Sequence, residues 1–130
     1  MPLTRITIGE VYQQTHCQQI SQILQQTLVA EFNVPEADCF QLFEPIASEN
    51  RVIHPRYLSP GRTDNFILFQ VLAGKPRSHH QQQRWVSALV TQLTEQMGIN
   101  GADVMVTIQY NRPCDWSFAN GQLFTLEDNQ

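Results

Sequence analysis

Apolar and polar side chains alternate along the first residues of the chain, in the segment PLTRITI. A period of two is typical of a β-strand that buries one face, so we expect a strand from Pro2 to Ile8. A helical period follows, because apolar residues recur at three- and four-residue steps between Tyr12 and Phe32. Pro35 disfavours helical geometry in the residue before it, which predicts the end of this helix at Asn33-Val34-Pro35.

Two further strands and a long connection come next. We expect a second strand from Cys39 to Phe43 and a third in the apolar run FILFQVL, Phe66 to Leu72. A continuous apolar run is typical of a strand buried on both faces. The intervening residues 44–64 contain three prolines and a glycine and predict a loop. This loop is longer than most connections in a compact domain, and such loops are often functional.

A second helix is predicted after the third strand. Ser78-His79-His80-Gln81 fits a capping box, in which the serine caps the first turn and the glutamine reaches back to it. The helix carries apolar residues on one face and ends at Gly98, a residue suited to a helix C-terminus. Val104 to Tyr110 predicts a fourth strand. Cys114 to Phe124 is expected to form a short hairpin or arm around Asn120-Gly121.

The two halves of the chain therefore repeat the order strand, helix, strand. The segment FNVPEADCF at residues 32–40 aligns with MGINGADVM at residues 97–105, and the same offset pairs apolar residues of the two helices. Any two amphipathic helices can be slid into register, whereas the Ala-Asp shared before each second strand favours an internal duplication.

These patterns predict an α/β (α+β) fold of two tandem β-α-β units. They form one four-stranded mixed sheet with both helices on one face and a short C-terminal hairpin. We expect residues 1–130 to form a single domain, with pseudo-repeats at about 1–47 and 65–112. The connecting loop spans residues 48–64, and a C-terminal arm spans residues 113–130.

Composition and charge narrow the class of protein. The net charge of −4 gives no footprint for nucleic acid, and no apolar run is long enough to span a membrane. The three cysteines are widely spaced, which favours reduced thiols packed as small apolar groups. No segment resembles a signal peptide. We therefore expect a soluble, cytoplasmic protein without nucleic-acid or membrane partners.

The predicted topology brings chemically useful residues to one rim of the sheet. If the first and third strands are adjacent and antiparallel, Pro2 lies beside the segment Gly74-Lys75-Pro76-Arg77 that follows the third strand. Asp38, just before the second strand, lies at the same end. Removal of Met1 would make Pro2 a secondary amine, which is a base and a nucleophile. An amine, a carboxylate and two cations on one rim suit an acidic substrate with a proton to move.

Each of these residues also has an ordinary structural explanation. A proline suits the first position of a strand, and an aspartate before a strand is commonly a turn or capping residue. Lys75 and Arg77 could be solvated charges, although a helix N-terminus does not favour cations. No phosphate-binding glycine loop, nucleophile elbow or zinc spacing occurs in the sequence, so we expect no metal and no cofactor.

Several short motifs occur together in an order typical of one family. They are MPL at the start, Val34-Pro35-x-x-Asp38, Tyr57-Leu58 with Arg62-Thr63-Asp64, Pro76-Arg77-Ser78, and Asp115-Trp116-Ser117-Phe118 with Gly121. With these motifs the chain resembles the tautomerase superfamily of 4-oxalocrotonate tautomerase-like proteins, in particular the longer-chain group that includes malonate semialdehyde decarboxylase. The resemblance covers nearly the whole chain.

The resemblance implies a homotrimer and a catalytic N-terminal proline, which is Pro2 after removal of Met1. It implies that Asp38 positions or activates water or substrate, and that Arg77 binds the carboxylate of a small substrate. The second arginine of the pattern is Lys75 here, and a lysine orients a carboxylate less strictly. Trp116 and Phe118 match an aromatic wall over the proline, and a structural role as a core or subunit-interface anchor is compatible with that match.

The protonation state of Pro2 separates the possible activities. A tautomerase acting on a 2-keto or enol carboxylate needs a neutral amine. A malonate semialdehyde decarboxylase or hydratase instead needs a protonated amine that polarises the carbonyl, or an amine able to form an imine. Lys75, Arg77 and the aromatic wall favour the neutral amine, and Asp38 opposes them. We expect the tautomerase first and the decarboxylase second. A non-catalytic signalling or interaction trimer of the same fold is the third possibility.

Overall fold

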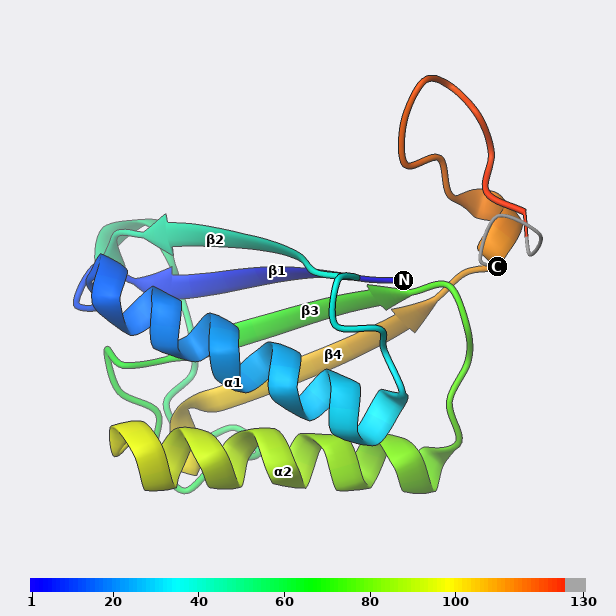
Figure 1. The fold of residues 1–130 in the computed structure, drawn as a ribbon. Coiled ribbons are helices and arrows are strands. Elements are labelled where there is room, and N and C mark those ends of the chain that lie inside the picture. Colours follow the sequence, from blue (N-terminus) through cyan, green and yellow to red (C-terminus); the bar gives the residue numbers. More distant parts are fainter. Residues whose placement is uncertain (126–130) are drawn as a thin grey trace.

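The fold is a single four-stranded sheet with two long helices on one side. The computed structural model describes residues 1–125, which contain β1 (Pro2–Gly9), α1 (Gln14–Phe32), β2 (Phe40–Ile46), β3 (Ile67–Ala73), α2 (His79–Met97) and β4 (Val104–Tyr110). Figure 1 shows both helices crossing the same face of the sheet. The predicted β-α-β units, the mixed sheet and the placement of the helices are confirmed.

The strand order is β2-β1-β3-β4, with the antiparallel pair in the centre. β1 is parallel to β2, β3 is parallel to β4, and β1 pairs with β3 in antiparallel register, Pro2 opposite Ala73. The start of β1 and the end of β3 therefore lie at one end of the sheet, as expected. This register is what brings the N-terminus next to the segment after β3.

The helices begin and end where their terminal residues dictate. Ser78 and Gln81 form the predicted capping box of α2, and Gly98 closes that helix at φ 69°. α1 ends at Asn33, which adopts a left-handed φ of 55°. The predicted start of α1 at Tyr12 was two residues early, because Tyr12 belongs to the turn after β1, where its amide donates to the Gly9 carbonyl.

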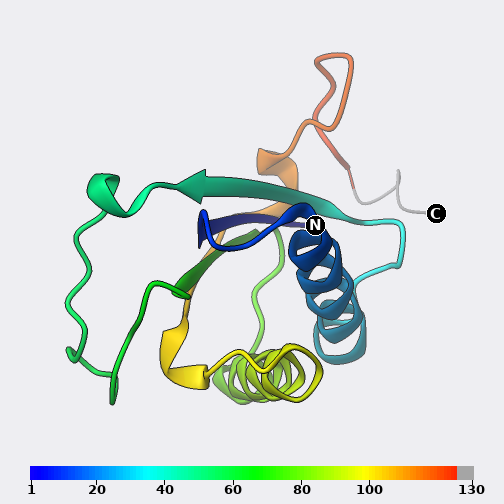
Figure 2. The same ribbon diagram turned by 90° about the vertical axis from the view of Figure 1, so that its left-hand side faces the viewer.

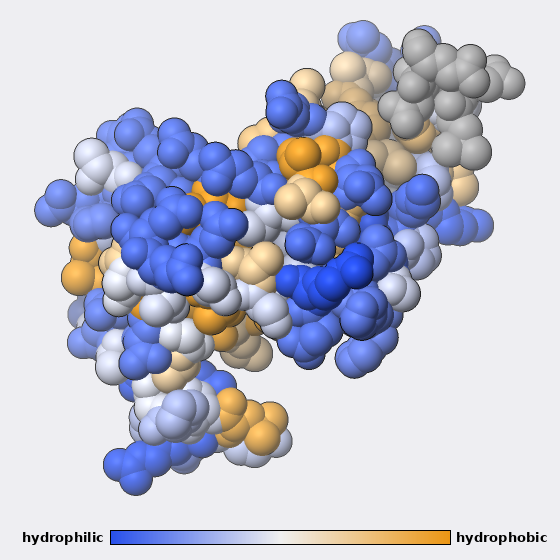
Figure 3. Space-filling model, turned by 60° about the horizontal axis from the view of Figure 1, so that its bottom comes forward, coloured by the Kyte–Doolittle hydropathy of each residue, from blue (hydrophilic) through white to orange (hydrophobic). Residues whose placement is uncertain are grey.

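The core fills the space between the sheet and the two helices. Its fully buried side chains come from β1, β3 and both helices and include Ile6, Phe69, Leu24, Trp85 and Leu89. Where the helices meet, the Trp85 indole N–H donates to the Thr27 hydroxyl at 3.2 Å. The outward surface of the helices carries glutamines, and the side of the molecule that bears α2 is largely hydrophilic (Figure 3).

The opposite face of the sheet has no helix over it (Figure 2). On β3, inward residues are buried, while Leu68 and Leu72 are half-buried and Gln70 is exposed. The expectation that this run is buried on both faces is therefore wrong for the single chain, because the loop residues that lie near Leu68 cover its outer face only in part. Phe40, Leu42 and Met105 are likewise 44%, 52% and 46% exposed.

β2 is longer than its predicted range, because at the edge of the sheet a strand can continue through a proline. It runs to Ile46 and includes Pro45, which pairs with Ile8. A proline lacks the amide hydrogen for a ladder but is tolerated at a sheet edge. The loop that follows spans residues 47–66 and so begins and ends slightly later than the predicted loop of residues 44–64. It contains one 3-10 turn (Ser48–Asn50) and projects away from the helices (Figure 2).

The C-terminal arm leaves β4 and stands apart from the sheet (Figure 1). It contains a 3-10 turn (Pro113–Asp115) and an antiparallel bridge between Ala119 and Gln122, around the predicted Asn120-Gly121 turn. The end of the predicted arm, residues 126–130, lies outside the described residues.

The cysteines were expected to be reduced and buried, and no membrane-spanning segment was expected. All three cysteines are free, but only Cys17 packs against the core, while Cys39 and Cys114 are exposed. Their predicted burial as small apolar groups is wrong for these two, because both lie in irregular segments at the surface. Within residues 1–125, no helix is both long and apolar enough to cross a bilayer.

Candidate active site

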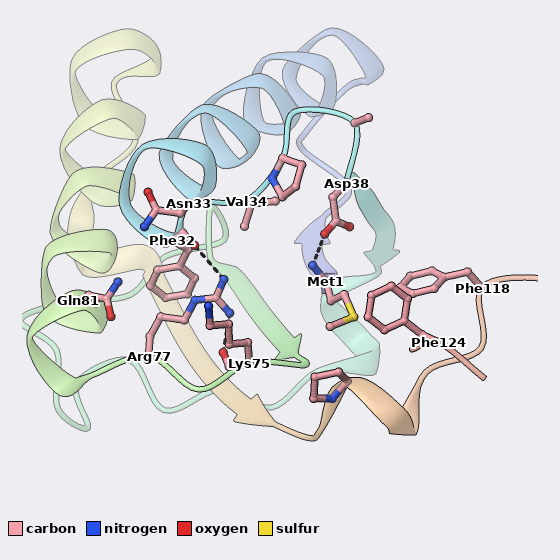
Figure 4. Close-up of a pocket in the computed structure, with 13 residues that line it drawn as sticks. Met1, Phe32, Asn33, Val34, Asp38, Lys75, Arg77, Gln81, Phe118 and Phe124 are labelled. Atoms are coloured by element: carbon pink, nitrogen blue, oxygen red, sulfur yellow. Dashed lines mark hydrogen bonds and ion pairs between the residues drawn. The ribbon is translucent and has the colours of Figure 1, made fainter. Parts of the chain in front are cut away.

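A pocket of about 630 Å³ lies at the end of the sheet where the chain begins. Its walls come from the N-terminus, the loop between α1 and β2, the segment between β3 and α2, and the C-terminal arm. The lining residues are Met1, Phe32, Asn33, Val34, Pro35, Ala37, Asp38, Lys75, Arg77, Gln81, Pro113, Phe118 and Phe124. Figure 4 shows these side chains converging from four separate parts of the chain.

The N-terminus reaches the pocket through β1. Pro2 is buried as the first residue of that strand, and Met1 lies in the pocket, where its amine forms an ion pair with the Asp38 carboxylate. The Met1 carbonyl accepts from the Gly74 amide at 3.1 Å. While Met1 is attached, the Pro2 nitrogen is a tertiary amide without a proton, so it is not basic. Removal of Met1 would free this nitrogen at the pocket.

Asp38 is held by the loop that follows α1. Its amide donates to the Pro35 carbonyl at 3.0 Å, and the Gln25 side chain donates to its carbonyl at 3.1 Å. One carboxylate oxygen, Oδ2, contacts the Met1 amine. The other, Oδ1, is buried and has no hydrogen-bond partner among the described residues. A buried carboxylate oxygen without a partner costs free energy, so this atom is suited to a proton donor supplied by the free Pro2 amine or a ligand.

Arg77 is fixed by two carbonyls at the far side of the pocket. Its guanidinium donates to the Lys75 carbonyl at 2.5 Å and to the Phe32 carbonyl at 2.8 Å. Partial burial lowers the pKa of Arg77, although it stays a cation because an arginine side chain is not deprotonated in proteins. Phe32 is the last residue of α1, so the guanidinium lies at the negative end of that helix dipole. This explains a cation that the N-terminus of α2 alone would disfavour.

Lys75 is less constrained than Arg77. Its side chain lines the pocket but its residue is exposed, and it projects from the end of β3. The two cations stand across the pocket from Asp38 (Figure 4). The site can therefore attract an anion with two positive groups while keeping one carboxylate beside the N-terminus.

An aromatic cluster closes the remaining side. Phe118 stacks on Trp116 with ring centroids 5.6 Å apart and contacts Phe124 edge-on at 5.8 Å. Trp116 lies behind this wall, where its indole N–H donates to Asn111 at 2.6 Å. A Cβ at Gly74 would come within 2.7 Å of the same nitrogen, so the tryptophan packs here only against a glycine. The wall reduces the access of water to one side of the pocket.

The structure brings most of the predicted site residues together. Asp38, Lys75, Arg77 and Phe118 line one pocket with Met1. Pro2 follows Met1 in the chain and is buried, and Trp116 stacks on Phe118; neither lines the pocket itself. Sequence reasoning missed Phe32, Gln81 and Phe124. Phe32 was assigned to the helix core, and the only signal for its second contact was its position at the end of the helix before Asp38.

The described residues offer no cluster for a metal ion. Within residues 1–125, no group of three or more His, Cys, Asp or Glu side chains is placed to coordinate one. The charged groups of the pocket are instead the Asp38 carboxylate, the Met1 amine and the cations of Lys75 and Arg77. Such a set can bind an acid and move a proton at an adjacent carbon.

Comparisons with known proteins agree on one family. The sequence model described as tautomerase enzyme matches residues 38–119. The chain is 27% identical over 127 residues to the probable tautomerase YusQ of Bacillus subtilis (strain 168), covering 98% of this chain and 100% of that protein. The probable tautomerase YrdN of the same organism is 28% identical over 122 residues and covers 94% of both chains.

Solved structures show the same similarity. A crystal structure of malonate semialdehyde decarboxylase superimposes with a TM-score of 0.86 at 25% identity, covering 92% of each chain. A fused 4-OT solved as a symmetric trimer shares the fold, with a TM-score of 0.75 at 18% identity over 93% of this chain and 94% of that one. The family match spans more than half of the chain, and the chain belongs to the tautomerase family of enzymes.

Proposed function

We propose that this protein is a cofactor-free tautomerase in which Pro2, freed by removal of Met1, is the catalytic base and acid. The substrate is a small 2-keto or enol carboxylate. The observation that carries the proposal is the pocket itself, where the N-terminus, Asp38 and two cations line one cavity. A secondary amine in such a pocket has a carboxylate on one side and a place for the substrate anion on the other.

Each residue has a distinct role in the proposed reaction. Arg77 and Lys75 bind the substrate carboxylate, which places the carbon next to the carbonyl at Pro2. The neutral Pro2 amine takes a proton from that carbon, and the electron pair moves onto the carbonyl oxygen. The prolinium then gives its proton to this oxygen, so that the enol forms and the amine is regenerated. Asp38 orients the prolinium through its carboxylate.

The electrostatic balance supports a neutral amine in the resting enzyme. Two cations line the same pocket as Pro2 would after processing, and like charges disfavour its ammonium form. Phe118 and Phe124 reduce solvation on one side, which acts in the same direction. Asp38 favours the charged form but is a single carboxylate. Together these groups favour a neutral Pro2 amine, which can act as a base at neutral pH.

Malonate semialdehyde decarboxylation is the alternative activity. It is supported by the similarity to the decarboxylase over 92% of the chain. In this reaction a protonated Pro2 would polarise the substrate carbonyl, and the bond to the carboxylate carbon would break. Its electron pair would move toward the carbonyl oxygen, which takes the proton of Pro2 to give an enol, and carbon dioxide would leave. The Asp38 carboxylate, with one buried oxygen lacking a partner, could stabilise the prolinium that this chemistry requires.

We also propose that the protein acts as a homotrimer in the cytoplasm. The outer face of the sheet leaves Phe40, Leu42 and Met105 about half exposed, and apolar surface of this kind favours association. A structural relative is a symmetric trimer. Native mass spectrometry should give about 45 kDa, three times the 14.9 kDa chain. A monomer in this measurement would contradict both the trimeric enzyme and the third possibility, a non-catalytic signalling or interaction trimer.

The test begins with the intact mass of the purified protein, which reports whether Met1 is absent. Processed protein should catalyse the ketonisation of phenylenolpyruvate, and Pro2→Ala should reduce kcat/KM at least about 1,000-fold, the upper range for loss of an acid–base group. The variant must remain trimeric and folded. Equal activity of the variant and the parent would refute the proposal.

An NMR titration of the Pro2 nitrogen separates the two chemistries. A pKa well below that of a free secondary amine is expected for the tautomerase. A raised pKa, together with release of carbon dioxide from malonate semialdehyde, would assign the decarboxylase instead. Protein made while methionine aminopeptidase is inhibited, and so retaining Met1, is the matched control. It keeps every side chain but should be inactive in both assays.

A further inference from the structure

The Arg77 guanidinium lies against the last residue of α1. Its central carbon is 4.9 Å from the centroid of the Phe32 ring, and one of its nitrogens donates to the Phe32 carbonyl at 2.8 Å. The same residue thus contacts the cation in two ways, through the face of its ring and through its backbone. Figure 4 shows the arginine between Phe32 and the centre of the pocket.

Phe32 itself cannot move freely. Its residue is 2% exposed, and its ring packs on Trp85 with centroids 5.1 Å apart. Trp85 is anchored in turn by its hydrogen bond to Thr27, whose hydroxyl donates to the Leu24 carbonyl. The contact with the guanidinium is therefore the outer end of a buried column that joins the two helices.

This column restricts the orientation of the guanidinium. An aromatic face attracts a cation and is most favourable when solvent is excluded. The bond to the Phe32 carbonyl fixes one nitrogen, and the bond to the Lys75 carbonyl at 2.5 Å fixes another. A guanidinium held in this way presents its remaining donors in a defined plane, as recognition of a planar carboxylate requires. Lys75 is exposed and offers no comparable restraint.

We propose that Phe32 is a positioning residue that orients Arg77 and so makes the pocket selective for a substrate with a free carboxylate. The inference rests on the proposed tautomerase function and deepens it. Phe32 acts through Arg77 and takes no part in the proton transfer at Pro2. Loss of its ring should therefore weaken the binding of the carboxylate more than the chemistry at the adjacent carbon.

The experiment compares two substrates that differ only at the carboxyl group. We would measure kcat/KM for phenylenolpyruvate and for its neutral methyl ester, in the parent and in Phe32→Leu, using protein that lacks Met1. The kcat/KM for the carboxylate divided by that for the ester should fall about tenfold in the variant. This is in keeping with the loss of a desolvated cation–π contact and the disordering of one charged hydrogen-bond donor. The fall should appear mainly in the KM for the carboxylate.

Phe69→Leu is the matched control. Phe69 is fully buried on β3 and does not line the pocket, so the substitution removes the same ring from the core alone. It should leave the ratio of the two substrates within about twofold of the parent value. Should Phe32→Leu fail to fold, Phe32→Met retains most of the buried volume without the aromatic face and should give the same fall.

A second background tests whether Phe32 acts through the arginine. In Arg77→Ala, the ratio should already be low, and addition of Phe32→Leu should not reduce it further. A Phe32 variant that slows both substrates equally, or an additive effect in the double variant, would overturn the inference and leave the proposed function intact. If the parent shows no Pro2-dependent turnover of either substrate, the proposed function itself fails.

Discussion

The two halves of the molecule have the same plan but their ends differ. α1 spans Gln14–Phe32 and α2 spans His79–Met97, so each bound of the second helix lies 65 residues after that of the first. The same offset relates Asp38 to Asp103, each just before the second strand of its half. These two aspartates therefore occupy corresponding places at opposite ends of the sheet.

Their environments are very different. Asp103 is 2% exposed, and both of its carboxylate oxygens accept from Thr63, one from the amide at 2.5 Å and the other from the hydroxyl at 2.7 Å. Asp38 contacts the Met1 amine with one oxygen, while the other is buried without a partner among the described residues. Both oxygens of Asp103 are therefore used within the fold, whereas one oxygen of Asp38 can still accept a hydrogen bond.

The cause lies in how each half begins. At the end of the sheet where β1 starts, one oxygen of the Asp38 carboxylate accepts from the Met1 amine. β3 is preceded by the long loop, whose Thr63 fills the acceptors of Asp103. The corresponding ends therefore differ: one forms the pocket at which we propose catalysis, and at the other the aspartate connects β4 to the preceding loop. Substitutions at the two aspartates should separate these roles.

The largest expected effect is on catalysis, from Asp38→Asn. Removal of the charge deprives the Pro2 amine of its only acidic neighbour in the described pocket, and kcat should fall about 100-fold, as for loss of a group that assists acid–base catalysis. Ketonisation of phenylenolpyruvate by the processed enzyme measures it. Glu36→Gln, an exposed carboxylate in the same loop, is the control and should leave kcat unchanged. A similar kcat for both variants would contradict this role.

Asp103→Asn should have the opposite profile. The asparagine presents an amide where two donors from Thr63 need acceptors, so a charge-assisted pair of hydrogen bonds is lost. The free energy of unfolding should fall by about 2 kcal/mol. Denaturant titration measures this loss, and kcat/KM below the melting transition should stay within about twofold of the parent. If Asp103→Asn reduced activity in fully folded protein, the two ends would not be separate in function.

The sequence predicted the fold and the polar part of the pocket because both follow from patterns along single elements. Pro2, Asp38 and Arg77 lie next to strands whose order and direction follow from the β-α-β repeat. Phe32 and Phe124 could not be found in this way, because their roles depend on side-chain directions at the end of a helix and in an irregular arm. The length of β2 was missed for a related reason: Pro45 is compatible with a strand only at an edge.

The next effect is smaller and concerns the second cation. Lys75→Arg replaces a point charge by a planar fork at the exposed side of the pocket, which should bind a substrate carboxylate through two parallel bonds. The KM for phenylenolpyruvate should fall about threefold, with kcat nearly unchanged, since each exposed charge contact contributes little. Lys75→Gln should raise the KM instead. An unchanged KM in both variants would exclude Lys75 from binding the carboxylate.

The last effect is expected in alkaline solution, at the end of the sheet that carries Asp103. Tyr12 corresponds in the first half of the chain to Arg77 in the second, at the same offset of 65 residues. Its hydroxyl donates to the Asn65 carbonyl at 2.6 Å. Burial, and secondarily the charge of Asp103, raises the pKa of Tyr12 from 10.0 to about 12. The unfolded chain therefore loses this proton first, so the stabilisation is complete below pH 10 and is lost as the pH rises toward 12.

Because Tyr12 is only partly buried, this loss should amount to about 1 kcal/mol, less than the full shift would give. Tyr12→Phe should make the free energy of unfolding less dependent on pH between 10 and 12, while Tyr57→Phe, at a ring that is 69% exposed, should leave the dependence as in the parent. Urea titrations at pH 10, 11 and 12 measure both slopes. If the pH dependence of Tyr12→Phe equalled that of the parent, this hydroxyl would not stabilise the end of the sheet that carries Asp103. The contrast between the two ends would then depend on Asp103 alone.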